Sequence, residues 1–128
     1  LDFLARTRLL NYMLPELAVQ VDFDQDSPYH ELTLWEHSVK TVRLSPAEVN
    51  VRWAALLHDS GKPYTRTVNK HGYSNYVHHE AVGAELATKV GHYLHWSKQR
   101  IQEVHDLVLH HLEPGSPIGD ADGQATKR

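Results

Sequence analysis

The chain contains no cysteine. Neither a disulfide framework nor a thiolate zinc site can therefore stabilise it, and any metal must be held by nitrogen and oxygen ligands. Long apolar runs are also missing, and residues 1–13 carry Asp2, Arg6 and Arg8 among their hydrophobic side chains. This pattern excludes a membrane span and a secretory signal there, so we expect a cytoplasmic protein.

The chain also lacks an excess of lysine and arginine over aspartate and glutamate. The formal net charge is −3 and the pI is near 6.4, whereas gripping duplex nucleic acid normally needs excess positive charge. We therefore expect no strong duplex binding. A small nucleotide or the phosphate at an RNA end is compatible with this charge. No heptad or exposed apolar stripe indicates an oligomeric state.

Apolar residues recur with the period of an α-helix along most of the 128 residues. No segment alternates polar and apolar residues for long enough to require a sheet. The length suits one domain, and we predict an all-α fold, a compact bundle of five to six helices. The main helices are expected over residues 1–14, 33–44, 46–58, 78–93 and 97–112. A loop at 14–30, a lid-like loop at 60–77 and an irregular tail at 113–128 complete the single domain, 1–128.

Several helix ends carry recognisable signals. Pro15 disfavours helix at the residue before it and should end the first helix. Thr33, with Glu36 three residues later, forms a capping-box pattern. Ser45 followed by Pro46 predicts the start of a further helix, with serine as the N-cap and proline in the first turn.

Histidine is unusually abundant, with eleven in the chain. Four histidines fall on the apolar side of a predicted helix when residues three, four and seven apart are aligned. These are His37, His58, His79 and His111. In each of the two His-His pairs, one ring is thus directed to the core and the other to solvent.

Buried imidazoles need partners for their ring nitrogens, and the carboxylate of Asp59 is costly to bury unless it is paired. One shared divalent ion would satisfy all these side chains together. A single histidine of this kind is more often a core residue bonded to a backbone carbonyl. Four such histidines, one of them directly before Asp59, favour a metal site that holds one or two divalent ions. Manganese, nickel, magnesium, iron and zinc are all candidates.

Three short motifs surround these residues. They are Leu34-Trp35-Glu36-His37, the doublet within Leu56-Leu57-His58-Asp59-Ser60-Gly61-Lys62-Pro63, and His79-Glu80 at a helix start. Together they resemble the HD superfamily of metal-dependent phosphohydrolases. Two further stretches are Gln25-Asp26-Ser27-Pro28-Tyr29-His30 and Gly83-Ala84-Glu85. These are similar to the HD domain of bacterial tRNA nucleotidyltransferases, the CCA-adding enzyme and poly(A) polymerase family.

The resemblance implies a helical bundle with metal at its centre, and hydrolysis of phosphomonoesters or cyclic phosphodiesters. The residues that match its ligand positions are His37, His58, Asp59, His79 and His111. Family patterns end with a further aspartate, for which the tail offers Asp120 and Asp122; we favour Asp122. The polymerase domain of the nucleotidyltransferases has no counterpart in this sequence, so CCA addition is not expected of it.

Asp59 and Lys62 are the predicted catalytic residues. Asp59 would bind metal and help orient the attacking water, and Lys62 would neutralise charge on a phosphate oxygen. The simpler alternative for Lys62 is a cation that complements a helix end. The expected substrate-binding residues are Lys62, Arg66, His30 and His78.

Three functions are consistent with these residues. The favoured one is a metal-dependent phosphohydrolase acting on nucleotides or RNA ends, with 2′,3′-cyclic phosphates or 2′-phosphates as substrates. The second keeps the chemistry but changes the substrate to a deoxynucleoside 5′-monophosphate or an alarmone. The third is a non-catalytic binding module in which the ion only holds the helices together.

Overall fold

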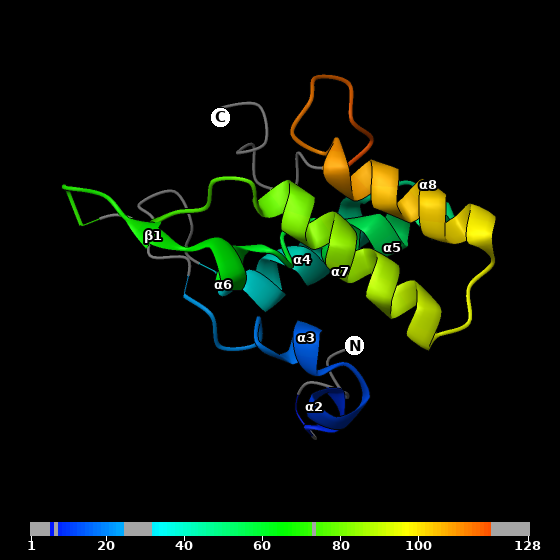
Figure 1. Ribbon diagram of the computed structural model, residues 1–128, viewed down its shortest axis with the longest axis horizontal. Helices are drawn as coiled ribbons and strands as arrows, with labels where there is room; N and C mark the ends of the chain where they lie inside the picture. The colour runs from blue at the N-terminus through cyan, green and yellow to red at the C-terminus, as the bar shows by residue number, and fades with distance from the viewer. Residues whose placement is uncertain (1–5, 7, 25–31, 73, 119–128) are drawn as a thin grey trace.

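The computed structural model describes residues 6, 8–24, 32–72 and 74–118. Four helices of nine residues or more dominate this part of the chain (Figure 1). They are α4 (Leu34–Leu44), α5 (Val49–Leu57), α7 (His79–Tyr93) and α8 (Lys98–Leu109). Three shorter helices accompany them: α2 (Leu9–Met13), α3 (Pro15–Ala18) and α6 (Lys62–Thr65). The predicted all-α class is confirmed, and the described residues contain four principal helices and three short ones.

The core lies where α5, α7 and α8 contact one another, and α4 packs on α5. α7 and α8 run side by side as an antiparallel pair (Figure 1). They approach closely at Gly91, where an added Cβ would lie 2.7 Å from the side chains of Ile101 and Trp96. Trp53 packs on Trp96 with ring centroids 4.9 Å apart. The two tryptophans at this end of the bundle therefore serve packing.

α4 begins where the sequence predicts. The Thr33 hydroxyl accepts a hydrogen bond from the Glu36 amide at 3.3 Å, and the Glu36 carboxylate accepts one from the Thr33 amide at 2.9 Å. The capping box is thus confirmed. Leu34 and Trp35 of this helix are buried, and the same face carries His37 into the bundle.

The helix start predicted at Ser45 and Pro46 is wrong. Ser45 is the C-cap of α4, and its hydroxyl donates to the Thr41 carbonyl at 2.7 Å instead of capping a new helix. α5 begins only at Val49, where the Glu48 carboxylate accepts hydrogen bonds from first-turn amides. The Glu48 side chain therefore satisfies donors that would otherwise lack partners.

The continuous helix predicted over 1–14 is also wrong in its described part. Arg8 has a left-handed φ of 61°, and α2 covers only Leu9–Met13. Pro15 ends the first helix as predicted, because Leu14 before it is non-helical, with φ −141° and ψ 72°. Pro15 itself is the first residue of α3, where its missing amide costs no hydrogen bond. The loop predicted after the first helix therefore opens with a helical turn, which buries Leu17 completely.

The segment predicted as a lid-like loop, 60–77, contains regular structure. Besides α6, it holds an antiparallel hairpin of β1 (Thr67–Val68) and β2 (Ser74–Asn75), which projects from the helical body (Figure 1). The expectation of no sheet missed this hairpin because strands of two residues are too short to show an alternating pattern.

The tail predicted as irregular continues beyond α8 in turns. Ile118 is buried and belongs to the core cluster, so this part of the tail packs back on the helices. Residues 119–128 lie outside the described residues. Among the helices of the described ranges, none combines the length and apolar character needed to cross a membrane.

Candidate metal centre

Side chains from separate elements meet in the middle of the bundle. They are His37 in the first turn of α4, His58 and Asp59 at the end of α5, His79 at the start of α7, and His111 just beyond α8. None of the five residues is more than 5% exposed. The structure therefore brings together five of the six predicted ligand residues. The sixth, Asp122, lies outside the described residues.

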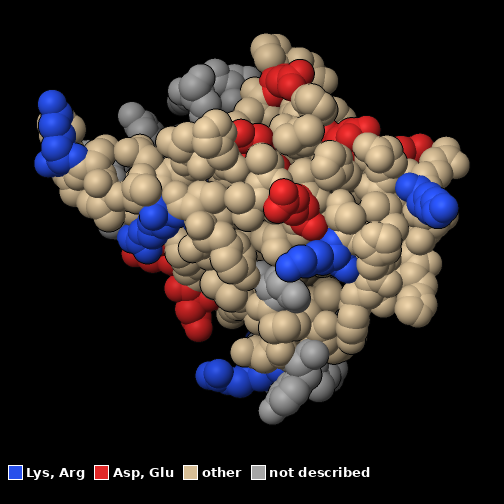
Figure 2. Space-filling view, viewed as in Figure 1, with Lys and Arg blue, Asp and Glu red and all other residues tan. Residues whose placement is uncertain are grey.

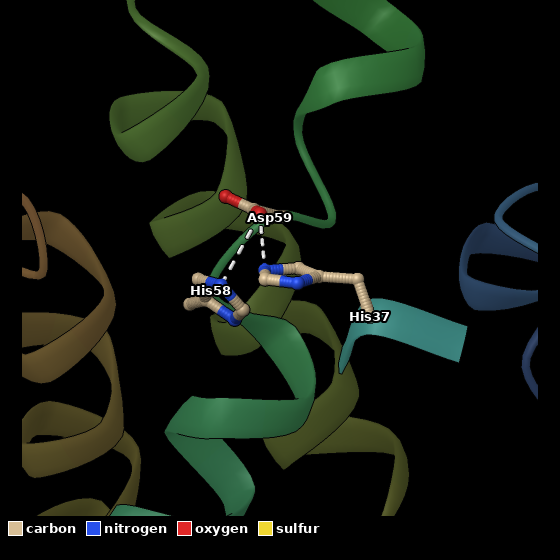
Figure 3. A group of neighbouring side chains, drawn as sticks. All are labelled: His37, His58 and Asp59. Carbon is tan, nitrogen blue, oxygen red and sulfur yellow. Dashed lines mark ion pairs between the residues drawn. The ribbon is translucent and has the colours of Figure 1, made fainter. Parts of the chain in front are cut away.

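One oxygen of Asp59 faces His37 and His58 (Figure 3). Oδ2 lies 3.4 Å from Nε2 of His37 and 3.1 Å from Nε2 of His58. The ligand atoms of these three residues all lie within 4.8 Å of one another. The two rings are tilted by 54° with centroids 5.3 Å apart, so they converge on the carboxylate without stacking. This group could hold one metal ion.

The other oxygen of Asp59 faces a second pair of rings. Oδ1 lies 3.1 Å from Nε2 of His79 and 3.5 Å from Nε2 of His111. These atoms form a second potential ligand group within the same 4.8 Å limit. Because Asp59 belongs to both groups, its carboxylate could bridge two ions or serve a single ion with a subset of the rings.

Backbone carbonyls fix the protonation of three rings. Nδ1 of His58, His79 and His111 each lies near the carbonyl oxygen of the residue three positions earlier, at 2.6, 2.9 and 2.6 Å respectively. A carbonyl oxygen can only accept a hydrogen bond, so we assign the proton to Nδ1. Each neutral ring then has its lone pair on Nε2, the atom that faces Asp59.

These lone pairs face atoms that cannot donate to them. They meet the oxygens of Asp59, and Nε2 of His79 also meets Nε2 of His111 at 3.3 Å. Both Asp59 oxygens are buried, and within the described ranges neither accepts a hydrogen bond of good geometry, although nitrogens lie close by. Electron-pair donors that converge in this way fit a divalent cation, which supplies the missing positive charge.

Lys62, the first residue of α6, is only 1% exposed. Its Nζ lies 3.3 Å from Oδ2 of Asp59 and 5.2 Å from the centre of the Tyr76 ring. The ammonium therefore offsets part of the carboxylate charge and rests against an aromatic face. A surface cation that merely complements a helix end would not be buried in this way. Contact between Lys62 and a substrate phosphate stays a proposal.

The charges around Asp59 keep it ionised. Burial alone would raise the pKa of the Asp59 carboxyl, but the His58 ring and the Lys62 ammonium hold that pKa well below its ordinary value. Burial also lowers the pKa of His58, and the nearby Asp59 only partly offsets this effect. At neutral pH the pair is a carboxylate and a neutral imidazole, the two forms that bind a cation.

The turn after Asp59 touches the start of α7 through its backbone. A Cβ added to Gly61 would lie 2.2 Å from the carbonyl oxygen of His79 and 2.8 Å from the amide nitrogen of Gly83. No larger residue fits without moving one of the two backbones. Glycine at this position therefore allows the turn after Asp59 to approach the start of α7, which carries His79.

Two predicted substrate residues lie outside the buried cluster. Arg66 follows α6, and its Nε donates to the Ser74 hydroxyl at 2.8 Å. The His78 side chain is 81% exposed, with Nδ1 3.9 Å from the Glu80 carboxylate. The third such residue, His30, lies outside the described residues. Their contact with a substrate stays a prediction.

Tyr76 has a role that the sequence analysis missed. Its carbonyl accepts from Nδ1 of His79, and its ring lies against the Lys62 ammonium. An aromatic residue in a loop has no periodic signal, and its contact with Lys62 depends on how the hairpin returns to α7. The sequence signal that could have found it is its place three residues before His79, the spacing shared by all three ring-carbonyl pairs.

Comparison with known proteins shows which family and which proteins this chain is similar to. The protein-family model described as HD domain matches residues 34–125. A CC-adding tRNA nucleotidyltransferase of Thermus thermophilus is 38% identical over 119 residues, which is 88% of this chain and 27% of that protein. An A-adding tRNA nucleotidyltransferase of Deinococcus radiodurans is 38% identical over 88 residues, 64% of this chain and 20% of that protein. No solved structure gave a significant match.

The chain belongs to the HD domain family, within the superfamily of metal-dependent phosphohydrolases. The predicted likeness to the HD domains of tRNA nucleotidyltransferases is confirmed by these relatives. The chain spans only 27% and 20% of the length of the two relatives it matches, so their whole activities do not transfer to it.

Proposed function

We propose that the chain is a metal-dependent phosphohydrolase that acts on phosphomonoester or cyclic phosphodiester bonds of nucleotides or RNA ends. The observation that carries this proposal is Asp59, whose two oxygens each face a pair of histidine nitrogens inside the bundle. With the proton on Nδ1, a histidine that serves packing alone would turn Nε2 toward a hydrogen-bond donor, whereas His58, His79 and His111 turn it toward a carboxylate.

When bound, a divalent ion would lower the pKa of a water ligand toward neutrality and withdraw charge from a phosphoryl oxygen. His37 and His58 would hold it on one side, His79 and His111 on the other, and Asp59 between them. The bonds from Nδ1 to backbone carbonyls keep three of the rings oriented with Nε2 toward the centre. Asp122 is our proposed sixth ligand.

Asp59 and Lys62 are the proposed catalytic residues. Asp59 is ionised and contacted from both sides, so it is well placed to bind the metal and to orient an attacking water. The Lys62 ammonium, 3.3 Å from that carboxylate, would turn toward a phosphate oxygen as negative charge develops there. Burial strengthens both effects, because charges interact more strongly away from water.

The relatives support a substrate related to RNA. Both are named as tRNA nucleotidyltransferases, and a phosphate at an RNA end is the kind of group that a phosphohydrolase beside such an enzyme would remove. We therefore propose 2′,3′-cyclic phosphates and 2′-phosphates as substrates. Arg66, His30 and His78 are the proposed substrate-binding residues around the centre.

The depth of the cluster favours a second candidate function. An ion that only joins helix ends needs no access, and none of the five ligand residues exceeds 5% exposure. Under this alternative the chain is a non-catalytic binding module, and removing the metal should unfold it. A 5′-deoxynucleotidase or an alarmone hydrolase differs from the proposed function only in its substrate.

The experiment that tests the proposal measures product release by protein stripped with a chelator and refilled with nickel, manganese, magnesium, iron or zinc. The substrates are 2′,3′-cyclic AMP, 2′-AMP, deoxynucleoside 5′-monophosphates and guanosine tetraphosphate. We expect turnover of one of the first two compounds with at least one metal. Turnover confined to the 5′-monophosphates or to the alarmone would replace the proposed substrate with the alternative.

Asp59→Asn is the variant for this experiment, because it keeps the side-chain shape and removes the charge. Asp106→Asn is the matched control, since Asp106 is exposed on α8 outside the cluster. We expect Asp59→Asn to lose about a hundredfold or more in turnover, and Asp106→Asn to keep it. Folded, metal-loaded protein that hydrolyses none of the substrates would leave the non-catalytic module as the function.

A further inference from the structure

Positive charge is concentrated in one segment of this acidic chain. Residues 60–79 contain Lys62, Arg66 and Lys70, three histidines, and no aspartate or glutamate. The rest of the chain has ten lysines and arginines against sixteen carboxylates. Lys62 is buried against Asp59, so Arg66 and Lys70 are the arginine and the lysine that this segment exposes, beside a remainder of the chain whose formal charge is −6.

This segment forms α6 and the hairpin and leads into α7. Lys70 and His71 are exposed at the turn of the hairpin. Gly72, with φ of 82°, closes that turn by donating to the Asn69 carbonyl at 3.0 Å. Figure 2 shows a basic side chain at the end of the molecule where Figure 1 places the hairpin. The hairpin thus presents positive charge to solvent ahead of the helical body.

A line of contacts joins the hairpin to the candidate metal centre. Lys62 contacts Asp59 on one side and the Tyr76 ring on the other. The Tyr76 ring meets the Phe23 ring edge-on, with centroids 6.2 Å apart. The Arg66 guanidinium lies 5.3 Å from the centre of the same Phe23 ring, and a hairpin hydroxyl accepts from its Nε. Arg66 is therefore held in place between the centre and the hairpin turn.

We propose that the hairpin is a phosphate-binding arm for single-stranded RNA. Arg66 binds the phosphate nearest the metal centre, and Lys70 binds a phosphate further along the RNA. This inference rests on the proposed function, because it supposes that the phosphate at the RNA end enters the centre. Arg66 suits the inner position, since a guanidinium already oriented by an aromatic ring and a hydroxyl loses little freedom on binding phosphate.

The chemistry of the arm favours a single strand over a duplex. Arg66 and Lys70 can neutralise only a few phosphates, so binding needs contacts with bases as well. Tyr64 on α6 is 50% exposed and offers a ring on which an unpaired base can stack. Bases inside a duplex are already stacked and paired, and they are not available to such a ring.

Exposed carboxylates at the base of the hairpin limit the path of the strand. Asp22 and Asp24 stand on either side of Phe23 in the sequence, and both are exposed. A phosphate backbone near them would be repelled. The strand is therefore expected to leave Arg66 along the hairpin toward Lys70.

The test measures binding of a fluorescent single-stranded hexauridylate 3′-phosphate by anisotropy over a series of salt concentrations, using chelator-stripped protein. Lys70→Gln removes the outer cation, and Lys98→Gln is the matched control. Lys98 is an exposed lysine at the first position of α8, and α8 begins at the opposite end of the molecule from the hairpin (Figure 1). We expect Lys70→Gln to weaken binding about three- to tenfold at low salt and to reduce the slope of log K against log salt by about 0.7. Lys98→Gln should change neither quantity.

Equal binding by Lys70→Gln and Lys98→Gln would overturn the proposal, and so would a duplex that binds as tightly as the single strand. Turnover of 2′,3′-cyclic AMP by the refilled protein is a separate readout, because this small substrate does not reach along the hairpin. Binding that depends on Lys70 without any turnover would support the arm and refute the hydrolase. Turnover without such binding would refute the arm alone.

Discussion

The Nε2 atoms of His79 and His111 lie 3.3 Å apart, and both face Oδ1 of Asp59. Each ring has its Nδ1 against a backbone carbonyl, so this short separation sets two lone pairs against each other. A cation between them would convert the repulsion into attraction. The pair is therefore a candidate for a second metal position, beside the one that His37, His58 and Asp59 could form.

Removal of the His111 ring should reduce the metal content without abolishing it. In His111→Ala the group of His37, His58 and Asp59 keeps all its ligand atoms, whereas the other group loses one. We expect elemental analysis of refilled protein to find two ions per chain in the parent and one in the variant. His105→Ala, a partly buried position on α8, is the control. Equal metal content in the parent and His111→Ala would contradict a second position.

That the proposed ligand residues come together could be predicted from two kinds of local signal. His37 and His79 lie on apolar helix faces, and His58 and Asp59 form a motif at a helix end. Both signals hold in the folded structure, where tertiary packing buries these helix faces and this helix end. The orientation of the rings could not be predicted, because it depends on which carbonyls remain unpaired at the helix ends.

The wrong predictions of secondary structure come from local sequence signals that occur in two different structures. Serine before proline is typical of a helix start, yet Ser45 ends α4, because its hydroxyl reaches back to the preceding turn. Pro15 ends the helix before it, as predicted, but it also suits the first turn of the next one, so a helical turn lies where the sequence predicts a loop. The burial of Lys62 depends on its contacts with Asp59 and with Tyr76, the residue after β2, which no sequence period encodes.

The stability of the metal-free protein should fall as the pH drops from about 7.5 to about 5.5. Burial lowers the pKa of His58 in the folded protein, so the unfolded chain takes up a proton first once the pH passes about 6.5. The stabilisation that depends on neutral His58 is complete above about pH 6.5. It is lost as the pH falls toward the pKa of His58 in the folded protein, at up to about 1.4 kcal/mol per pH unit. The pKa of Asp59 is lowered as well, so its contribution is lost only below about pH 4.

Urea titrations with chelator present would measure this dependence. We expect His58→Asn to flatten the fall in unfolding free energy, and His95→Asn, at an exposed position, to preserve it. An unfolding free energy that rises as the pH falls through this range would contradict the assigned direction.

Lys62→Met should destabilise the metal-free protein by about 2–4 kcal/mol. Methionine fills much of the same space against Tyr76 but removes the ammonium from Asp59, which leaves a buried carboxylate less well compensated. Lys98→Met is the control, because an exposed lysine should change the unfolding free energy by no more than about 0.5 kcal/mol. Urea denaturation with and without manganese would show whether bound cation narrows the difference. A loss no larger than the control's would mean that Asp59 does not depend on Lys62.

Gly61→Ala should weaken metal binding by displacing the start of α7 rather than by removing a ligand. The added methyl group would meet the carbonyl oxygen of His79 at 2.2 Å, so one backbone must shift and carry the His79 ring away from Asp59. We expect a loss of about 2–3 kcal/mol in unfolding free energy together with weaker manganese binding by calorimetry.

Gly115→Ala separates this steric effect from a general loss of stability. Gly115 has a left-handed φ of 86° and no atom within 4 Å of an added Cβ, so alanine there strains the backbone without touching the centre. It should cost about 1 kcal/mol and leave manganese affinity unchanged. Equal affinities in Gly61→Ala, Gly115→Ala and the parent would show that the contact between Gly61 and α7 does not set the position of His79 in the metal centre.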